Sequence, residues 1–267
     1  MKLWGDYLRN GCPVCDGSSI ERGAWKIPLK PLDNLGQVGG VSLPYAATLD
    51  APLLFQFDQC KACGSVFGNP IPRFQAHTAA DAARHAEINA VESYRFRFAQ
   101  FRQHYPIQHG AFLDAACGAG EFLDLAASED GSRWTRLIGI DLCQAYVDNI
   151  RAGAWRHKGI VADLDEADVG NLIGGPVAFC VLNEAFEHLK HPAQVVDKLT
   201  AVLSPNGRIF FSAQLLGSEL PIRPSESVYV TNRGLDLVLS RAGLTLVKRW
   251  DQCGRALVVA EKLTTTS

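Results

Sequence analysis

From residue 108 onward, short apolar runs alternate with segments whose apolar positions recur every three or four residues. The apolar runs are rich in β-branched and aromatic residues, which is typical of buried strands. The predicted strands are 111–116, 135–142, 159–164, 176–182, 207–213, 244–250 and 255–262. The predicted helices are 121–128, 144–153, 192–203 and 231–243. This alternation predicts an α/β fold, with a parallel sheet that carries helices on both faces.

The last two predicted strands differ from the others in their connection. Only "DQCG" (251–254) separates them, which is too short for a crossover between parallel strands. They are therefore predicted to form an antiparallel hairpin, so the seven-stranded sheet is mostly parallel and ends in one reversed strand.

The part of the chain before residue 108 lacks this alternation. Residues 1–75 close with "GNPIPRF", in which two prolines indicate a linker. The next segment has no Gly or Pro up to about His104, and Thr78 with Asp81 offers a helix N-cap. We therefore divide the chain into a small module (1–75), a connecting helix (76–107) and an α/β domain (108–267).

Four of the eight cysteines form two equal C-x2-C pairs in the first module. The pairs are Cys12 with Cys15 and Cys60 with Cys63. Each pair can present two thiolates from one tight turn, and two pairs complete a tetrahedral zinc site with no open position. The sequence predicts a structural zinc ion in a zinc-ribbon-like module. The alternative is two redox-active or incidental cysteine pairs.

Charge and hydrophobicity limit the partners and the cellular location that we expect for this protein. The formal net charge is −2 and the pI is near 6.4, so a nucleic-acid partner is disfavoured. The apolar runs are far shorter than a membrane span, and the N-terminus "MKLWGDYLRNGCPVC" lacks a signal-peptide apolar region. We expect a cytoplasmic protein that does not contact a membrane.

The stretch "LDAACGAGEF" (113–122) carries the first strand into the first helix. Gly118 and Gly120 allow the backbone to approach a ligand, and the helix start offers free amide groups to an anion. Leu123 stands where a dinucleotide-binding fingerprint has its third glycine. Instead, Asp114 precedes the G-x-G pair by three spacers, so a different nucleotide-like ligand is indicated.

This stretch and four later ones together resemble the class I S-adenosylmethionine (SAM)-dependent methyltransferases. The matching stretches are, in order, "LDAACGAGEF", "LIGIDL", "IVADL", "VLNEAFEHLKHP" and "LSPNGRIFFS". The resemblance covers about the last 160 residues. It implies the Rossmann-like methyltransferase fold and SAM as cofactor. The chain departs from the family at Ala116, where glycine is frequent, and we expect so small a side chain to be tolerated.

The resemblance implies roles for particular residues. Asp114 and the glycine loop would hold the amino acid end of SAM, Asp141 its ribose hydroxyls and Asp163 its adenine amine. Turn formation or helix capping is the alternative for Asp114 and Asp163. Cys117 is interpreted as a packed turn residue and not as a nucleophile. The full expected cofactor set is Asp114, Ala116, Cys117, Gly118, Gly120, Asp141, Leu142, Asp163, Leu164, Asn183 and Tyr94.

The acceptor side is expected along "VLNEAFEHL" (181–189), with residues 214–230 as a lid that includes Tyr229. His188 is the predicted general base, with Glu187 beside it, because a histidine exchanges protons near neutral pH. Two alternatives remain. Glu187 and His188 could only orient the local helix. Glu184, Glu187 and His188 could instead hold a divalent metal, as a similar motif does in some O-methyltransferases of ubiquinone precursors and small RNA.

A cysteine-pair module before a SAM domain is similar to the nucleotide-sugar methyltransferases. We therefore expect methyl transfer to a hydroxyl or acidic carbon of a small molecule, a sugar or related metabolite, with a nucleotide-linked sugar as one candidate. Alternatives are an rRNA or other macromolecule methyltransferase and a SAM-binding protein without turnover. The acceptor, the methylated atom and the oligomeric state stay open.

Overall fold

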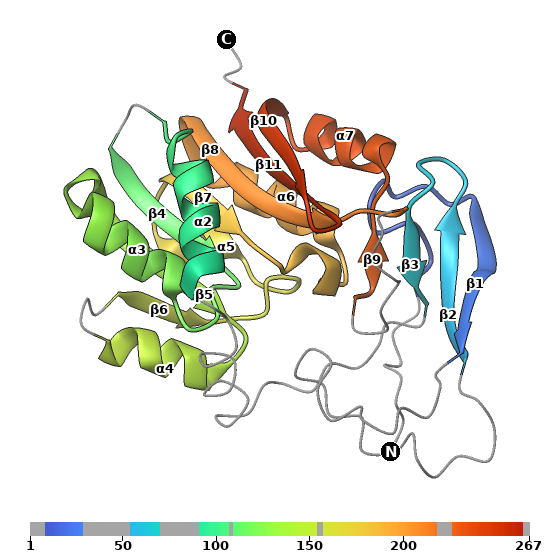
Figure 1. Cartoon of the computed structure of the whole chain (residues 1–267), viewed down its shortest axis with the longest axis horizontal. Coiled ribbons are helices and arrows are strands. Elements are labelled where there is room, and N and C mark those ends of the chain that lie inside the picture. The colour runs from blue at the N-terminus through green and yellow to red at the C-terminus, as the bar shows by residue number, and fades with distance from the viewer. Residues whose placement is uncertain are drawn as a thin grey trace.

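The computed structural model describes residues 9–28, 54–69, 91–106, 109–153, 157–217 and 226–263. Its larger sheet has seven strands in the order β10-β11-β8-β7-β4-β5-β6 (Figure 1). The strands are β4 (Gly110–Ala115), β5 (Trp134–Asp141), β6 (Lys158–Val161), β7 (Val177–Leu182), β8 (Leu203–Gln214), β10 (Leu244–Gln252) and β11 (Arg255–Lys262). Only β11 runs antiparallel to its neighbours β8 and β10, which confirms the predicted mostly parallel sheet and its terminal hairpin.

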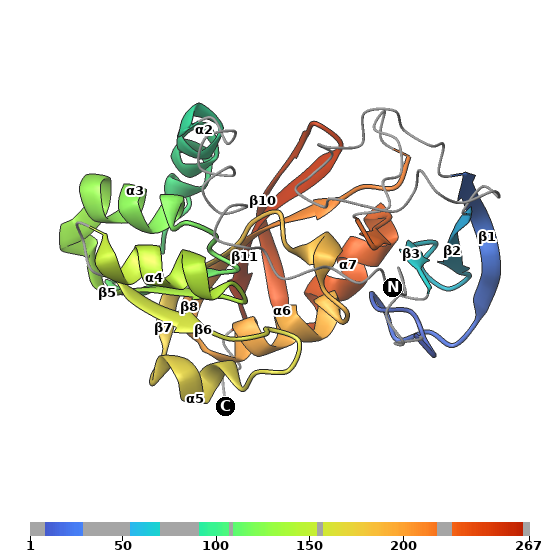
Figure 2. The same cartoon turned by 90° about the horizontal axis from the view of Figure 1, so that it is seen from below.

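Helices cover both faces of this sheet (Figure 2). They are α2 (Val91–Arg102), α3 (Glu121–Asp130), α4 (Gln144–Ala152), α5 (Val169–Ile173), α6 (Pro192–Ala201) and α7 (Asn232–Arg241), with 3-10 helices η3 (Gly131–Arg133) and η4 (Phe186–His188). Adjacent residues of β4 serve opposite faces: Phe112 packs with the aromatic residues of α2 and α3, and Leu113 with residues of α5, α6 and α7. Because both faces are buried at the centre of the sheet, β4 and β7 are almost continuously apolar.

A second sheet of four strands lies beside the first, at the right in Figure 1. Its strands are β1 (Ile20–Pro28), β2 (Leu54–Cys60), β3 (Val66–Gly68) and β9 (Val228–Tyr229), and every pair is antiparallel. The fourth strand comes from the segment after β8, about 160 residues later in the chain than β3. The cysteine module and the α/β region therefore share a sheet.

The expected lid over 214–230 is wrong for Tyr229. This side chain is 1% exposed, packs edge-to-face on Phe57 and donates a hydrogen bond to Glu226. Strand pairing of Val228 and Tyr229 with β3 buries the aromatic ring, which leaves it no freedom to close over a ligand. Residues 218–225 lie outside the described residues.

Other element predictions differ from the structure at their ends. The predicted helix from 78 is observed over Val91–Arg102, and residues 70–90 lie outside the described part. Strand β8 begins at Leu203, four residues early, and its pairing with β7 is irregular where Pro205 and Asn206 interrupt the ladder. None of the described helices is long and apolar enough to span a membrane. The three-part division of the chain stays a prediction.

Candidate functional site

Strand β4 delivers a buried carboxylate to the carboxyl edge of the sheet. Asp114 is 2% exposed, and its Oδ2 atom has no hydrogen-bond partner among the residues that the structure describes. Burial, together with the nearby Glu121 and Asp141, raises the pKa of this carboxyl well above its usual range. A buried polar atom without a partner is costly, so this oxygen is suited to a ligand that brings a donor or a positive charge.

The turn that follows Asp114 exposes its backbone. Ala116, Gly118 and Gly120 all have positive φ, at 59°, 54° and 93°. A side chain at Gly118 would meet nothing within 4 Å, so open space lies beside this peptide, whereas one at Gly120 would approach Ile150 to 3.0 Å. Ala116 adopts a left-handed conformation, in which an L-residue carries a strain of about 1–2 kcal/mol, so a glycine would fit this position with less strain.

Cys117 sits in the bend of this turn. Its amide donates to the Ile140 carbonyl at 3.0 Å, and its Sγ occupies the space that a side chain at Gly139 would need. Burial, followed by the charges of Asp114 and Asp141, raises the pKa of the thiol well above its usual range. A neutral, enclosed thiol is a poor nucleophile, which supports the interpretation of Cys117 as a packed turn residue.

Asp141, at the end of β5, ties the turn to the next loop. Its Oδ2 accepts a hydrogen bond from the Gly118 amide at 2.9 Å, and its Oδ1 accepts one from the Cys143 amide at 2.8 Å. Leu142 follows with 58% of its surface exposed. The structure thus brings Asp141 and Leu142 to the same edge as the glycine turn.

The residues predicted after β6 lie in a polar turn. The Oδ1 atom of Asp163 accepts a hydrogen bond from the Asp165 amide at 3.0 Å, and its Oδ2 lies 3.6 Å from Lys190 Nζ. Leu164 is buried at 5% exposure. Asp163 is therefore a turn-forming residue, as in the alternative interpretation, but its half-buried carboxylate remains within reach of a ligand.

Helix α2 carries two side chains to this edge, one turn apart. Tyr94 packs edge-to-face on Phe122 at 5.0 Å, and its pKa is raised by burial and by the carboxylates of Glu121, Glu184 and Asp114. Arg97 bonds to Asn183 Oδ1 at 3.3 Å and to Glu184 Oε1 at 2.7 Å. Tyr94 thus lies beside the predicted site. Sequence reasoning missed Arg97, although its spacing of three from Tyr94 was a signal.

Two residues after the end of β7, Glu184 adopts a strained left-handed backbone with a φ of 51°. Its amide donates to Ser212 Oγ at 2.6 Å, which fixes the turn. Burial raises the pKa of Glu184, but the positive charges of Arg97 and Arg255 lower it by more, so the net shift is downward. This carboxylate stays ionised near neutral pH, with 37% of its side chain exposed at the predicted acceptor side.

The structure separates the two predicted catalytic residues. Glu187 is fully buried and forms an ion pair with Arg255, which also lies 3.3 Å from Glu226 Oε1. His188, at the end of η4, is exposed. These contacts favour a structural role for Glu187, while the general-base role of His188 stays a prediction. Arg255 gave no sequence signal, since it contacts Glu187 only in the folded chain.

The divalent-metal alternative lacks a suitable cluster. In the described part of the chain, only Cys12, Cys15, Cys60 and Cys63 bring three or more possible ligand atoms together. Glu187 is directed to Arg255 and Glu184 to Arg97, so the motif that suggested a metal is engaged by two arginines instead.

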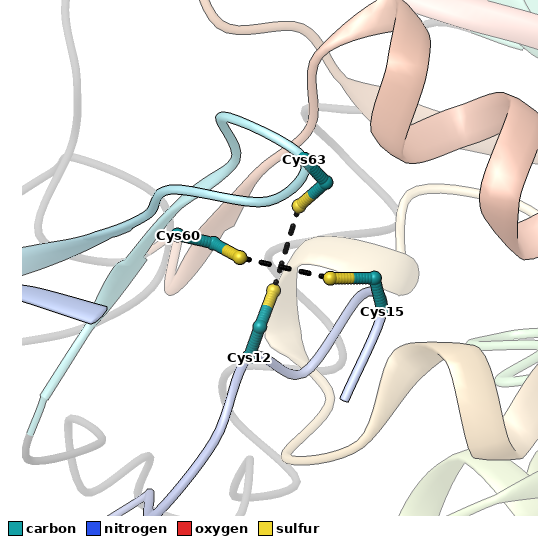
Figure 3. A group of neighbouring side chains, drawn as sticks. All are labelled: Cys12, Cys15, Cys60 and Cys63. Atoms are coloured by element: carbon teal, nitrogen blue, oxygen red, sulfur yellow. Dashed lines mark hydrogen bonds between the residues drawn. The ribbon is translucent and has the colours of Figure 1, made fainter. Parts of the chain in front are cut away.

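The four cysteine side chains of the first module converge on one point (Figure 3). The Sγ atoms of Cys12 and Cys63 lie 3.6 Å apart, as do those of Cys15 and Cys60, and all four lie within 4.8 Å of one another. Zinc–sulfur bonds of about 2.3 Å in a tetrahedron place sulfurs about 3.8 Å apart, so the cluster is compatible with zinc. A side chain at Gly17 would approach Cys15 Sγ to 3.2 Å, so this glycine keeps the space beside the sulfurs free.

The strand order and the carboxylates at the carboxyl edge define a protein of the class I methyltransferase type. Residues 85–248 match the methyltransferase domain family, and the chain belongs to this family. It is also 32% identical over 107 residues to the ubiquinone biosynthesis O-methyltransferase of Histophilus somni (strain 2336). The match takes in 38% of this chain and 43% of that relative, so the chain spans less than half of the relative's length.

Two solved structures support the fold. The SAM-bound amino pentose methyltransferase CalS10 of Micromonospora echinaspora has a TM-score of 0.53 and 16% identity, over 72% of this chain and 99% of that one. The N-methyltransferase NodS of Bradyrhizobium japonicum WM9, in complex with S-adenosyl-l-homocysteine (SAH), has a TM-score of 0.50 and 16% identity, over 68% and 91%. At such identities the likeness concerns the fold alone.

Proposed function

We propose that the chain transfers a methyl group from SAM to a small-molecule acceptor. The observation that carries this proposal is the buried Asp114 carboxylate, which has an oxygen without a partner among the described residues and is followed, in the same turn, by the open backbone of Gly118. An ammonium group supplies both the charge and the donors that this oxygen needs, and the amino acid end of SAM carries one.

The remaining cofactor residues fit the same orientation. The Asp141 carboxylate accepts hydrogen bonds from the Gly118 and Cys143 amides at the sheet edge, and a carboxylate can accept up to about four hydrogen bonds, which suits a ribose hydroxyl pair. The exposed Leu142 offers an apolar surface to a flat base, and Asp163 offers an acceptor for an exocyclic amine. Tyr94 would then close the site from α2.

SAM, when bound, supplies an already activated methyl group. The protein has to align the acceptor and take up its proton. His188 is the proposed base, and Glu184 is held beside it by Arg97 and Arg255. A neutral amine acceptor needs no base, so this role favours a hydroxyl or an acidic carbon.

The acceptor proposed is a sugar or related metabolite, on the resemblance of the cysteine-pair module to nucleotide-sugar methyltransferases. In this proposal the four cysteines hold a structural zinc ion and the protein is cytoplasmic. The slightly negative net charge disfavours RNA. Binding of SAM without turnover is the second candidate.

Calorimetry with SAH, followed by a methyl-release assay, tests the proposal. The acceptor panel contains free sugars, nucleotide-linked sugars and small phenols. We expect SAH binding that Asp114→Asn weakens, and methyl release with at least one acceptor. A folded wild-type protein that does not bind SAH would refute the cofactor assignment. SAH binding with no release across the panel would favour the second candidate.

A further inference from the structure

A buried arginine links the cysteine module to the acceptor side of the proposed site. Arg9 lies three residues before Cys12 and is 2% exposed. Its guanidinium donates to the carbonyls of Gly68 at 3.0 Å and Ser227 at 3.2 Å, which belong to or flank strands β3 and β9. Arg9 therefore sits where the two parts of the chain share a sheet.

The same guanidinium reaches the segment that follows His188. Its Nε donates to the Lys190 carbonyl at 3.2 Å, and one terminal nitrogen donates to the Leu189 carbonyl at 3.0 Å. In addition, Ser227 bonds the Glu187 carbonyl through its amide at 2.8 Å and its hydroxyl at 3.0 Å. The peptides on both sides of His188 are thus fixed by groups anchored to the cysteine module.

The loop after β6, which carries the proposed adenine contact, also binds the segment 187–191. The carboxylate of Asp165 accepts hydrogen bonds from the Lys190 amide at 2.9 Å and the His191 amide at 2.8 Å. Asp165 lies two residues after Asp163, the proposed adenine contact. Residues 187–191 are therefore held between Asp165 on one side and Arg9 on the other.

Further contacts make this arrangement depend on the cysteine turns. The Pro13 carbonyl, inside the first turn, accepts from the Ala193 amide at the start of α6. The Cys63 carbonyl accepts from Thr231 Oγ1, which also caps α7. Arg9 itself is anchored by two hydrogen bonds with Asn69.

We propose that Arg9 is a positioning residue for the acceptor side. Through it, the cysteine module sets the conformation of residues 187–191, while the cofactor residues on β4 and β5 stay independent of the module. The catalytic part of this inference rests on the proposed function. Its structural part does not, because it concerns only the order of one segment.

The test compares Arg9→Lys with Arg22→Lys in the full chain. Lysine keeps the charge but has three donors on one nitrogen, so it cannot reach the same set of carbonyls. Arg22 belongs to the same module, pairs with Asp58 at 2.6 Å and donates to the Arg9 backbone carbonyl at 3.3 Å, but its side chain is half exposed and no described contact joins it to the Arg9 guanidinium or to residues 187–191. Ser227→Ala is a milder change and serves as the test variant if Arg9→Lys does not fold.

The first readouts are amide hydrogen exchange and SAH affinity. We expect faster exchange in 186–191 and 226–230 for Arg9→Lys, a smaller effect in the same segments for Ser227→Ala, and no change for Arg22→Lys. SAH affinity should stay within about twofold of wild type for all three, because β4 and β5 are intact. Wild-type protein treated with a chelator should show the exchange pattern of Arg9→Lys.

Turnover gives the second readout. With an acceptor found in the methyl-release assay, Arg9→Lys should lower kcat about 10- to 100-fold, the loss expected when reacting groups are misaligned. Unchanged exchange in 186–191, or a loss of SAH affinity as large as the loss of turnover, would overturn the positioning role. Absence of turnover in the wild type would instead count against the proposed function and leave the exchange result valid.

Discussion

Replacing Glu187 with glutamine separates a structural role from a chemical one. The side chain is fully enclosed, with one oxygen paired to Arg255 and the other without a partner among the described residues. Glutamine has nearly the same shape and keeps one acceptor oxygen for Arg255. The change therefore removes a charge and leaves the packing in place.

The size of the effect follows from the surroundings of Arg255. Breaking a buried ion pair typically costs about 3–5 kcal/mol, because one charge is left uncompensated. Arg255 keeps Glu226 at 3.3 Å and Glu184 at 3.9 Å, so its charge stays partly balanced. We therefore expect Glu187→Gln to lower the free energy of unfolding by about 2–3 kcal/mol, below that range. For a chain of this size, Tm falls about 2–4 °C per kcal/mol, which gives a drop of about 4–12 °C.

Thermal unfolding followed by circular dichroism measures this drop, with Glu184→Gln as the control. Glu184 lies on the same segment and pairs with Arg97, but its side chain is 37% exposed. Pairs accessible to water contribute up to about 1 kcal/mol, so the control should lose only a few degrees. An unchanged Tm for Glu187→Gln together with lost turnover would refute the reasoning and restore Glu187 as a catalytic residue.

Four further predictions concern the cofactor, the base and the metal. Asp141→Ala removes the acceptor of two loop amides and should weaken SAH binding about 10- to 100-fold by calorimetry; unchanged affinity would remove Asp141 from the site. Because its pKa is raised, Asp114 should release a proton when the SAH ammonium binds, seen as a dependence of the binding enthalpy on the buffer that Asp114→Asn abolishes. A buffer-independent wild-type enthalpy would contradict this. Cys12→Ala with Cys60→Ala should eliminate stoichiometric zinc in elemental analysis, and metal retention would argue against the site. His188→Ala should lose turnover with intact SAH binding and no effect of a mild chelator, whereas full activity would defeat the base.

The larger sheet was predictable because its signals are local. The central strands β4 and β7 are buried on both faces, so each appears as an almost uninterrupted apolar run, and the longer helices between strands each show their own period. The four-residue link before Arg255 was enough to predict the antiparallel hairpin. Helix α5 was missed because "VGNLI" is only five residues long and has no repeat to detect.

The candidate site was predictable only in its backbone-determined part. Asp114, Asp141 and the glycine turn follow strand ends, so their meeting at one edge follows from the parallel sheet. Arg97 and Arg255 come from a helix and a hairpin that both reach the Glu184 carboxylate through tertiary packing. Nothing in the order of residues relates Arg255 to Glu187, so the ion pair that makes Glu187 a structural residue could not be inferred.

The shared four-stranded sheet changes how the proposed zinc ion would act on the enzyme. The prolines near residue 75 predicted a boundary, yet strand β3 on one side of it pairs with β9 from beyond β8. A module joined only by a linker could unfold without affecting the rest of the chain. Here unfolding would break the β3–β9 pairing and release the carbonyls of Leu189 and Lys190 from Arg9. Loss of the metal would therefore disorder the acceptor side first. Asp114 and Asp141 make no described contact with the module, so they would keep their geometry.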